Sequence, residues 1–142
     1  MNAHQLRDII EEGENDRIEF KRCGNQPEKD LFETICAFAN TFGGTILLGV
    51  EDDGSLTGVN STQVLPVTRN IRNVVSNPNA FDVPVSLEFE HIEIDDRQII
   101  KVDVPNSPQM HSYKGKVYER RGDADVVVRG SAPLAELCIR KQ

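Results

Sequence analysis

The sequence of 142 residues has few cysteines, no long apolar run and no excess of basic residues. Its three cysteines are odd in number, widely spaced and never arranged C-x-x-C, so neither a disulfide framework nor a thiolate zinc site is expected. No segment approaches the roughly eighteen apolar residues that a membrane span needs. The amino terminus also lacks a basic start followed by an apolar run. We therefore expect a cytoplasmic protein with no membrane partner.

The motifs of nucleotide-hydrolysing and zinc enzymes are missing too. Gly43-Gly44 follows a predicted helix rather than preceding one, and no Lys-Ser/Thr comes next. Neither a P-loop ATPase nor a nucleotide cofactor is therefore predicted. His4, His91 and His111 stand far apart without the H-x-x-x-H spacing of a helical zinc site.

The charge is acidic overall, with 23 Asp and Glu against 16 Lys and Arg and a formal net charge of -7. This sum is a mild argument against non-specific nucleic-acid binding, which depends on Lys and Arg that neutralise phosphates. The distribution matters more than the sum, because acids dominate residues 8–19 and 88–96 whereas residues 113–121 are basic. A positive face on an acidic protein is therefore compatible with the sequence.

Residues 40–54, which read NTFGGTILLGVEDDG, are the stretch around which the chain is organised. Gly43 or Gly44 supplies the left-handed residue that ends a helix. The apolar residues 45–50 then predict a strand that is covered on both faces. Because this strand runs directly into acidic residues 51–53, those acids are held where a rigid element opens to solvent.

Apolar periodicity and turn residues predict the remaining elements. Helices are expected at residues 3–12, 27–41, 61–76 and 133–141, and strands at residues 17–22, 56–59, 83–90, 99–104, 116–121 and 125–129. Hairpin-connected strands mixed with helices imply an α+β fold of two layers, with a mixed, largely antiparallel sheet and three to four helices. Residues 1–142 are expected to form a single domain.

Three carboxylates, Glu14, Glu19 and Asp52, form the first candidate site. Glu14 and Glu19 are five residues apart and would face opposite sides of one continuous strand. They converge only if Glu14 lies in the turn before the strand, and Gly13 allows that bend. Asp52 joins them if the central strand neighbours the strand at residues 17–22. Such an oxygen cluster suits Mg²⁺ or Mn²⁺ and metal-assisted cleavage of a phosphodiester.

The same acids have a purely structural interpretation. Glu19 would pair with Lys21 or Arg17 on a solvated strand face. Glu14 would lie exposed at a helix end, and Asp52 would stabilise a turn. Most surface acids do no more than this.

A basic and aromatic segment, residues 111–122 (HSYKGKVYERRG), is the second candidate site. Cations neutralise phosphates and tyrosine rings stack on bases, so the segment is typical of a nucleic-acid surface. The alternative is a solvated hairpin whose tyrosines cap the core. The predicted nucleic-acid contacts are Lys114, Lys116, Tyr118, Arg120 and Arg121, with Lys21 and Arg22 as additional phosphate contacts.

Three blocks of the sequence occur in the order and spacing of a known family. They read ENDRIEFK at residues 14–21, AFANTFGG at residues 37–44 with GVEDDG at residues 49–54, and GKVYERRG at residues 115–122. Together they resemble the Schlafen-type AlbA-like domain, which is also described in bacteria as a DNA-binding or "divergent AAA" domain. The resemblance implies an AlbA-like α+β fold of a kind found in bacterial regulators. The "divergent AAA" description is not supported, since the phosphate loop that it requires is missing.

The resemblance also bears on function. Some Schlafen proteins are metal-dependent endoribonucleases that act on structured RNA such as transfer RNA, and their carboxylate triad would match Glu14, Glu19 and Asp52. In the animal enzymes two such modules embrace the substrate, and here a homodimer could substitute for the second.

The sequence is therefore compatible with three functions. The leading prediction is a nucleic-acid-binding module, for RNA or DNA, in a regulatory protein such as a transcriptional regulator. The second is a Mg²⁺- or Mn²⁺-dependent endoribonuclease of Schlafen type. The third is a protein-interaction or dimerisation module in which the acids are only surface.

Overall fold

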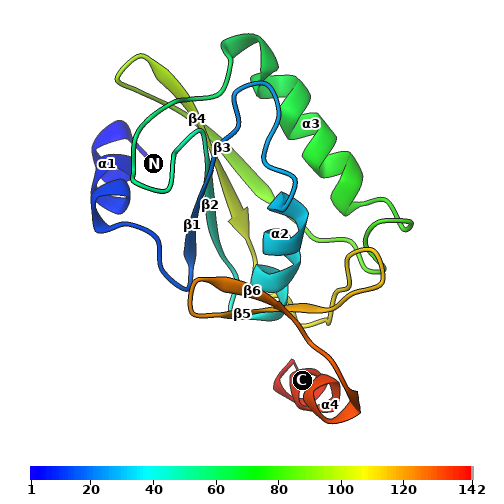
Figure 1. Ribbon diagram of the computed structural model, residues 1–142. Coiled ribbons are helices and arrows are strands. Elements are labelled where there is room, and N and C mark those ends of the chain that lie inside the picture. Colours follow the sequence, from blue (N-terminus) through cyan, green and yellow to red (C-terminus); the bar gives the residue numbers. More distant parts are fainter. Residues whose placement is uncertain (142) are drawn as a thin grey trace.

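The structure is a computed structural model that describes residues 1–141 (Figure 1). It contains α1 (Ala3–Glu12), β1 (Ile18–Lys21), α2 (Leu31–Asn40), β2 (Gly44–Leu48), η1 (Ser61–Gln63), α3 (Val64–Val75), β3 (Glu88–Ile94), β4 (Arg97–Val104), β5 (Tyr118–Arg121), β6 (Ala124–Val127) and α4 (Ser131–Arg140). The predicted α+β class, with a mixed sheet and four helices, is confirmed. None of the helices within residues 1–141 has the length and apolar content that crossing a bilayer requires.

Four strands form the main sheet in the order β1-β2-β4-β3. β1 runs parallel to β2, with Ile18 opposite Thr45 and Lys21 opposite Leu48. The pairs β2–β4 and β3–β4 are antiparallel. β2 is therefore an internal strand and β1 an edge strand. β5 and β6 form a separate antiparallel ribbon, which lies beside α2 (Figure 1).

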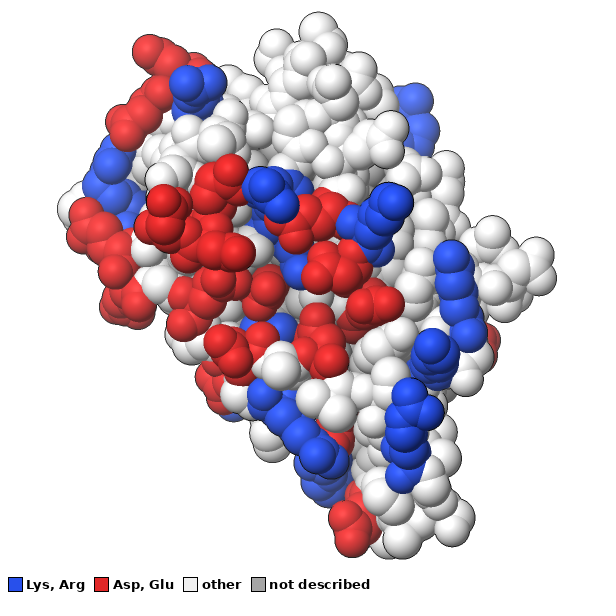
Figure 2. All heavy atoms as spheres, in the orientation of Figure 1, with Lys and Arg blue, Asp and Glu red and all other residues white. Residues whose placement is uncertain are grey.

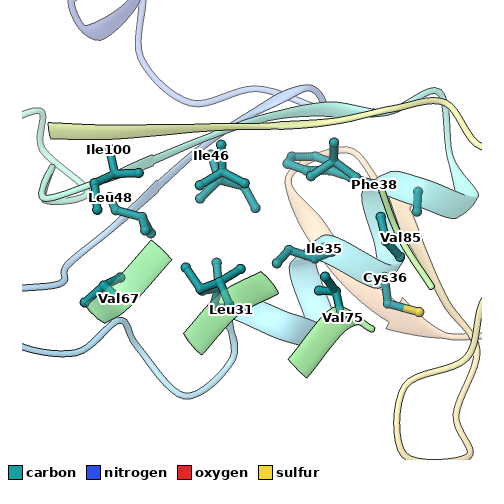
Figure 3. Packing of buried hydrophobic residues seen from close by; sticks show 14 of the residues in the cluster. Leu31, Ile35, Cys36, Phe38, Ile46, Leu48, Val67, Val75, Val85 and Ile100 are labelled. Atoms are coloured by element: carbon teal, nitrogen blue, oxygen red, sulfur yellow. The ribbon is translucent and has the colours of Figure 1, made fainter. Parts of the chain in front are cut away.

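The internal strand β2 is buried on both faces, as its apolar sequence predicts. Ile46 and Leu48 pack against α2 and α3 in the larger core cluster (Figure 3). Leu47 packs with Leu6 of α1 in a second cluster on the other face. Each such side chain contributes about 1.5–3 kcal/mol by leaving water. Because α1 covers the face opposite α2 and α3, the expected two layers become three where α1 lies (Figure 1).

Some element boundaries differ from the predicted ones because backbone hydrogen bonds, rather than apolar periodicity, decide them. α2 begins at Leu31, since Glu28 exchanges hydrogen bonds with the backbone of Arg22 and holds the preceding segment beside the end of β1. Residues 56–59 make only isolated bridges instead of a continuous strand. β3 begins at Glu88, because Val85 donates its N–H to the end of α3.

Candidate functional site

The turn between α1 and β1 brings Glu14 to the free edge of the sheet. α1 ends at Gly13, whose φ of 85° is a left-handed value that suits glycine. The chain then bends, and Glu14 Oε2 accepts a hydrogen bond from the Phe20 N–H at 3.0 Å. Since β1 is an edge strand, this carboxylate satisfies a backbone donor that no neighbouring strand covers. Glu14 thus lies in the turn before the strand, where convergence with Glu19 requires it to be.

The environment of Glu14 favours its protonated form. The pKa of Glu14 is raised from 4.5 to about 7, mainly by burial, although the Phe20 N–H opposes the rise. The charges of Glu19 and Asp52 contribute to this rise, because like charges disfavour ionisation. The structure therefore brings the three predicted carboxylates close enough to interact electrostatically.

Glu14→Gln is expected to remove a pH-dependent loss of stability. The folded-state pKa lies above the unfolded value, so the folded protein binds this proton more tightly. The resulting stabilisation is fully present below about pH 4.5 and is lost as the pH rises through about 7. Solvent screening at this half-buried site limits the loss to about 1–2 kcal/mol.

Urea unfolding of both proteins at about pH 5 and about pH 8 measures this effect. The glutamine keeps an oxygen acceptor for the Phe20 N–H, so the comparison isolates the charge. Glu14→Gln should be the more stable protein at the higher pH. A difference that does not change with pH would contradict the assignment.

Glu19 is bound by two cations of the protein itself. Its Oε2 lies 2.6 Å from Arg120 Nη2, and its Oε1 lies 3.5 Å from Lys21 Nζ. Arg120 also reaches Asp125, with 2.8 Å between Nη1 and Oδ1. The Arg120 guanidinium lies 4.7 Å from the centroid of the Phe38 ring, and its side chain is 1% exposed. One buried arginine therefore joins β1, α2, β5 and β6.

Glu19 binds these cations, and Glu14, Glu19 and Asp52 do not form a common metal site in the described part of the chain. Within residues 1–141 no group of three or more His, Cys, Asp or Glu side chains is placed to hold a metal. Both Glu19 oxygens face protein cations, and Glu14 already accepts a backbone hydrogen bond. Asp52 is exposed in the turn after β2. Oxygen donors suit Mg²⁺ or Mn²⁺, but in this arrangement the three do not fit one ion, and their metal-binding and catalytic roles stay predictions.

The seven side chains predicted to contact nucleic acid divide sharply by exposure. Arg22, Lys114, Lys116 and Arg121 are exposed, whereas Lys21, Tyr118 and Arg120 are buried. Lys21 Nζ lies 2.9 Å from Asp30 Oδ1, and the Tyr118 hydroxyl donates to Glu33 Oε1 at 3.3 Å. Lys21, Tyr118 and Arg120 hold elements together in this fold. This corrects the predicted surface, because a polyanion cannot reach them there.

The sequence reasoning missed two residues that the structure makes prominent. Asn40 is buried at the end of α2, where its Nδ2 donates to the carbonyls of His111 and Tyr118 and its Oδ1 accepts from the His111 N–H. In the sequence, an amide side chain on the buried face of an otherwise apolar helix could have indicated a buried hydrogen-bonding residue. Phe42 has a φ of 60°, a left-handed value that is rare for a bulky residue. In the sequence, only the position of this aromatic residue immediately before a double glycine could have indicated an unusual turn.

The fold and the side chains around Glu19 define a class of protein, a small α+β domain with an internal apolar strand. In this class an acidic side chain binds the backbone of the edge strand, and a buried arginine attaches the two-stranded ribbon to the main sheet. The family described as "Schlafen, AlbA_2" matches residues 14–129, and the chain belongs to that family. α1 precedes the matched residues and α4 follows them.

Two solved structures are similar to this chain. One is the solution NMR structure of the N-terminal domain of an ATP-dependent DNA helicase RecG-related protein from Nitrosomonas europaea, with 26% identity and a TM-score of 0.62 over 89% of this chain and 92% of that one. The other is the DIP2311 protein from Corynebacterium diphtheriae, with 17% identity and a TM-score of 0.59 over 88% of this chain and 29% of that one, which shows a shared fold. No curated protein matches the chain significantly.

Proposed function

We propose that this chain is a nucleic-acid-binding module of regulatory type. The observation that carries the proposal is the separation of charge on the surface (Figure 2). Acidic side chains predominate on the part of this face over α1 and β1, with some Lys and Arg among them, whereas Lys and Arg predominate along the right-hand and lower edges, next to the β5–β6 ribbon and α4. A cationic edge of this kind is what a phosphate backbone requires.

We call this surface the ribbon edge; it consists of Lys114, Lys116, Arg121, Arg129 and Arg140, all of which are exposed. Lys114, Lys116 and Arg129 make no ion pair with any residue in 1–141, so their charges are free to meet phosphates. Arg121 and Arg140 share the Glu119 carboxylate, at 2.6 and 2.9 Å, which leaves one excess positive charge. They also line an open pocket of about 580 Å³ between β5 and α4.

The formal net charge of -7 is spread over the whole chain, so it is the distribution of charge that permits this binding. Glu19, Asp125 and Asp30 pair with buried Arg120 and Lys21, so three of the acids and two of the cations are paired with one another in the fold, and these pairs account for one of the seven net negative charges. The likeness to the N-terminal domain of a protein named for a DNA helicase also supports a nucleic-acid partner.

A triple variant of the ribbon edge, Lys114→Ala with Lys116→Ala and Arg121→Ala, tests the proposal. Affinity for RNA or DNA should fall by about tenfold or more, and the dependence of log affinity on log salt should flatten by roughly one for each lost phosphate contact. Fluorescence anisotropy over a salt series measures both quantities.

The matched control removes the same charge elsewhere, through Arg7→Ala, Arg69→Ala and Arg97→Ala, three exposed arginines outside the ribbon edge. An equal loss in both triple variants would show that only net charge matters. A wild-type protein without affinity at low salt would refute nucleic-acid binding, and a stable homodimer without such affinity would favour an interaction module.

The endoribonuclease stays a prediction, because Glu19 pairs with Arg120 and Lys21 and Glu14 accepts a backbone hydrogen bond, so neither presents free oxygens. Asp52 gives a sharp test, since it is exposed and makes no ion pair within residues 1–141. Asp52→Asn should abolish Mn²⁺-dependent cleavage of transfer RNA if the triad is catalytic, whereas loss of cleavage in Glu19→Ala would be confounded by loss of a buried ion pair.

A further inference from the structure

Phe42 is the only aromatic side chain of residues 1–141 that is exposed, with 61% of its surface accessible. It lies in the turn between α2 and β2, and its ring takes no part in either core cluster. An exposed apolar ring that adds nothing to the core indicates a binding role most clearly when its backbone conformation is also unfavourable. That is the case here.

The backbone at Phe42 takes a conformation that normally belongs to glycine. The Gly43 N–H donates to the Phe38 carbonyl at 2.8 Å, and this bond closes the end of α2. In such a closure the residue before the donor takes the left-handed conformation, and Phe42 has a φ of 60°. Glycine would adopt this conformation without strain. The fold therefore does not account for a phenylalanine at this position.

One face of the ring is covered by a cation. The guanidinium carbon of Arg17, which directly precedes β1, lies 5.5 Å from the centroid of the Phe42 ring. Arg17 is exposed and makes no ion pair with any residue in 1–141. A ring backed by an unpaired arginine offers the two interactions that a nucleotide needs, stacking for the base and a positive charge for the phosphate.

The turn is adjacent to the proposed binding surface. Thr41 Oγ1 accepts a hydrogen bond from the Arg120 N–H at 3.0 Å, so the turn lies against β5, next to Arg121 (Figure 1). From the other side, Lys141 Nζ donates to the Ala39 carbonyl at 2.6 Å and brings the end of α4 to the end of α2. Phe42 thus lies within three residues of contacts to β5 and to the end of α4, the elements that carry Arg121 and Arg140 of the ribbon edge.

We infer that Phe42 and Arg17 form a stacking platform for an unpaired base, which makes a single-stranded or locally opened nucleic acid the ligand. This inference rests on the proposed function and specifies its substrate class. The strand would follow the cations of the ribbon edge and place one base on the open face of the Phe42 ring. Inside a continuous duplex each base is stacked between its neighbours and offers no free face of this kind.

Phe42→Gly tests the platform, and a substitution at exposed Leu65 is its control. Phe42→Gly removes the ring and relaxes the backbone, so the variant should fold with unchanged or higher stability. Its affinity for short oligo-dT or oligo-rU should fall at least about fivefold, while its affinity for a duplex of equal length should not change. The control is Leu65→Ser, which removes an exposed apolar side chain from α3 without placing a glycine inside the helix. It should leave both affinities unchanged.

The absence of tryptophan from the sequence allows a direct reading of stacking. Phe42→Trp introduces a single tryptophan whose fluorescence should be quenched by oligo-dT and not by duplex, and Leu65→Trp is the control that should not respond. Quenching that accompanies the loss of affinity in Phe42→Gly would support the platform.

The stacking platform and nucleic-acid binding itself can be refuted separately. If the wild-type protein binds oligo-dT and Phe42→Gly binds equally well, the platform is wrong and the proposed function stands. If the wild-type protein binds no nucleic acid at low salt, the proposed function and the platform both fall. If Phe42→Gly instead changes the oligomeric state of the protein, the exposed ring is a protein contact and the inference is overturned.

Discussion

Replacing Arg120 by methionine is expected to lower the free energy of unfolding by about 3–5 kcal/mol, because it leaves two carboxylates without their partner. Arg120 lies 2.6 Å from Glu19 and 2.8 Å from Asp125, and it is almost completely buried. The methionine keeps apolar contact with the Phe38 ring, so the loss reflects charge more than volume. Urea unfolding near neutral pH measures the change.

Arg121→Met is the matched control for this prediction. Arg121 is the next residue in the same strand, but its side chain is 64% exposed and its partner Glu119 also pairs with Arg140. The control should cost less than about 1 kcal/mol. Adding Glu19→Gln and Asp125→Asn to Arg120→Met should recover a large part of the lost stability, since no unpaired charge then remains. Equal costs for the two arginine variants would refute the structural role of Arg120.

The sequence was sufficient to predict the centre of the fold because local chemistry determines it. An apolar run after a double glycine gave a strand covered on both faces, and β2 is such a strand. The bend at Gly13 was necessary for Glu14 to approach Glu19, and the chain bends there. β1 is also a neighbour of β2, as the prediction of a carboxylate cluster required, and the structure shows that the two strands run parallel.

The faces of the β5–β6 ribbon could not be predicted in the same way. Arg120 and Arg121 are chemically identical neighbours, and their composition identifies the segment as basic without saying which side chain faces inward. Alternation along a strand places them on opposite faces, but the inward face is set by α2 and by Glu19, which is distant in sequence. Arg120 therefore became an internal cation and left Arg121 at the surface.

The left-handed conformation of Phe42 could not be predicted from the sequence for a related reason. The double glycine predicted a helix end at residue 41, and α2 ends at Asn40; either glycine was expected to take the left-handed position. In the structure Phe42 and Gly43 both have positive φ, of 60° and 73°. Local preference assigns such values to glycine, so a phenylalanine there is visible only once the backbone is known.

Gly43→Ala is expected to destabilise the protein by about 3 kcal/mol or more, since it combines backbone strain with a steric clash. A Cβ at this position would lie 2.6 Å from the Val104 carbonyl oxygen and 2.7 Å from the Asn106 nitrogen. Both are backbone atoms, and Val104 is held in β4, where it pairs with Gly44 of β2. The chain therefore cannot relieve the contact by moving a flexible side chain.

Gly115→Ala separates the two contributions to that cost. Gly115 has a similar φ of 80°, but a Cβ there would meet no atom within 4 Å. Its replacement should cost only the conformational strain, about 1–2 kcal/mol. Urea unfolding of the two variants then gives the cost of the clash by difference, and equal values would mean that the backbone at Val104 yields easily. A rigid contact at Gly43 would also explain how a strained residue is kept at position 42, because the turn that holds Phe42 outward has no room to rearrange.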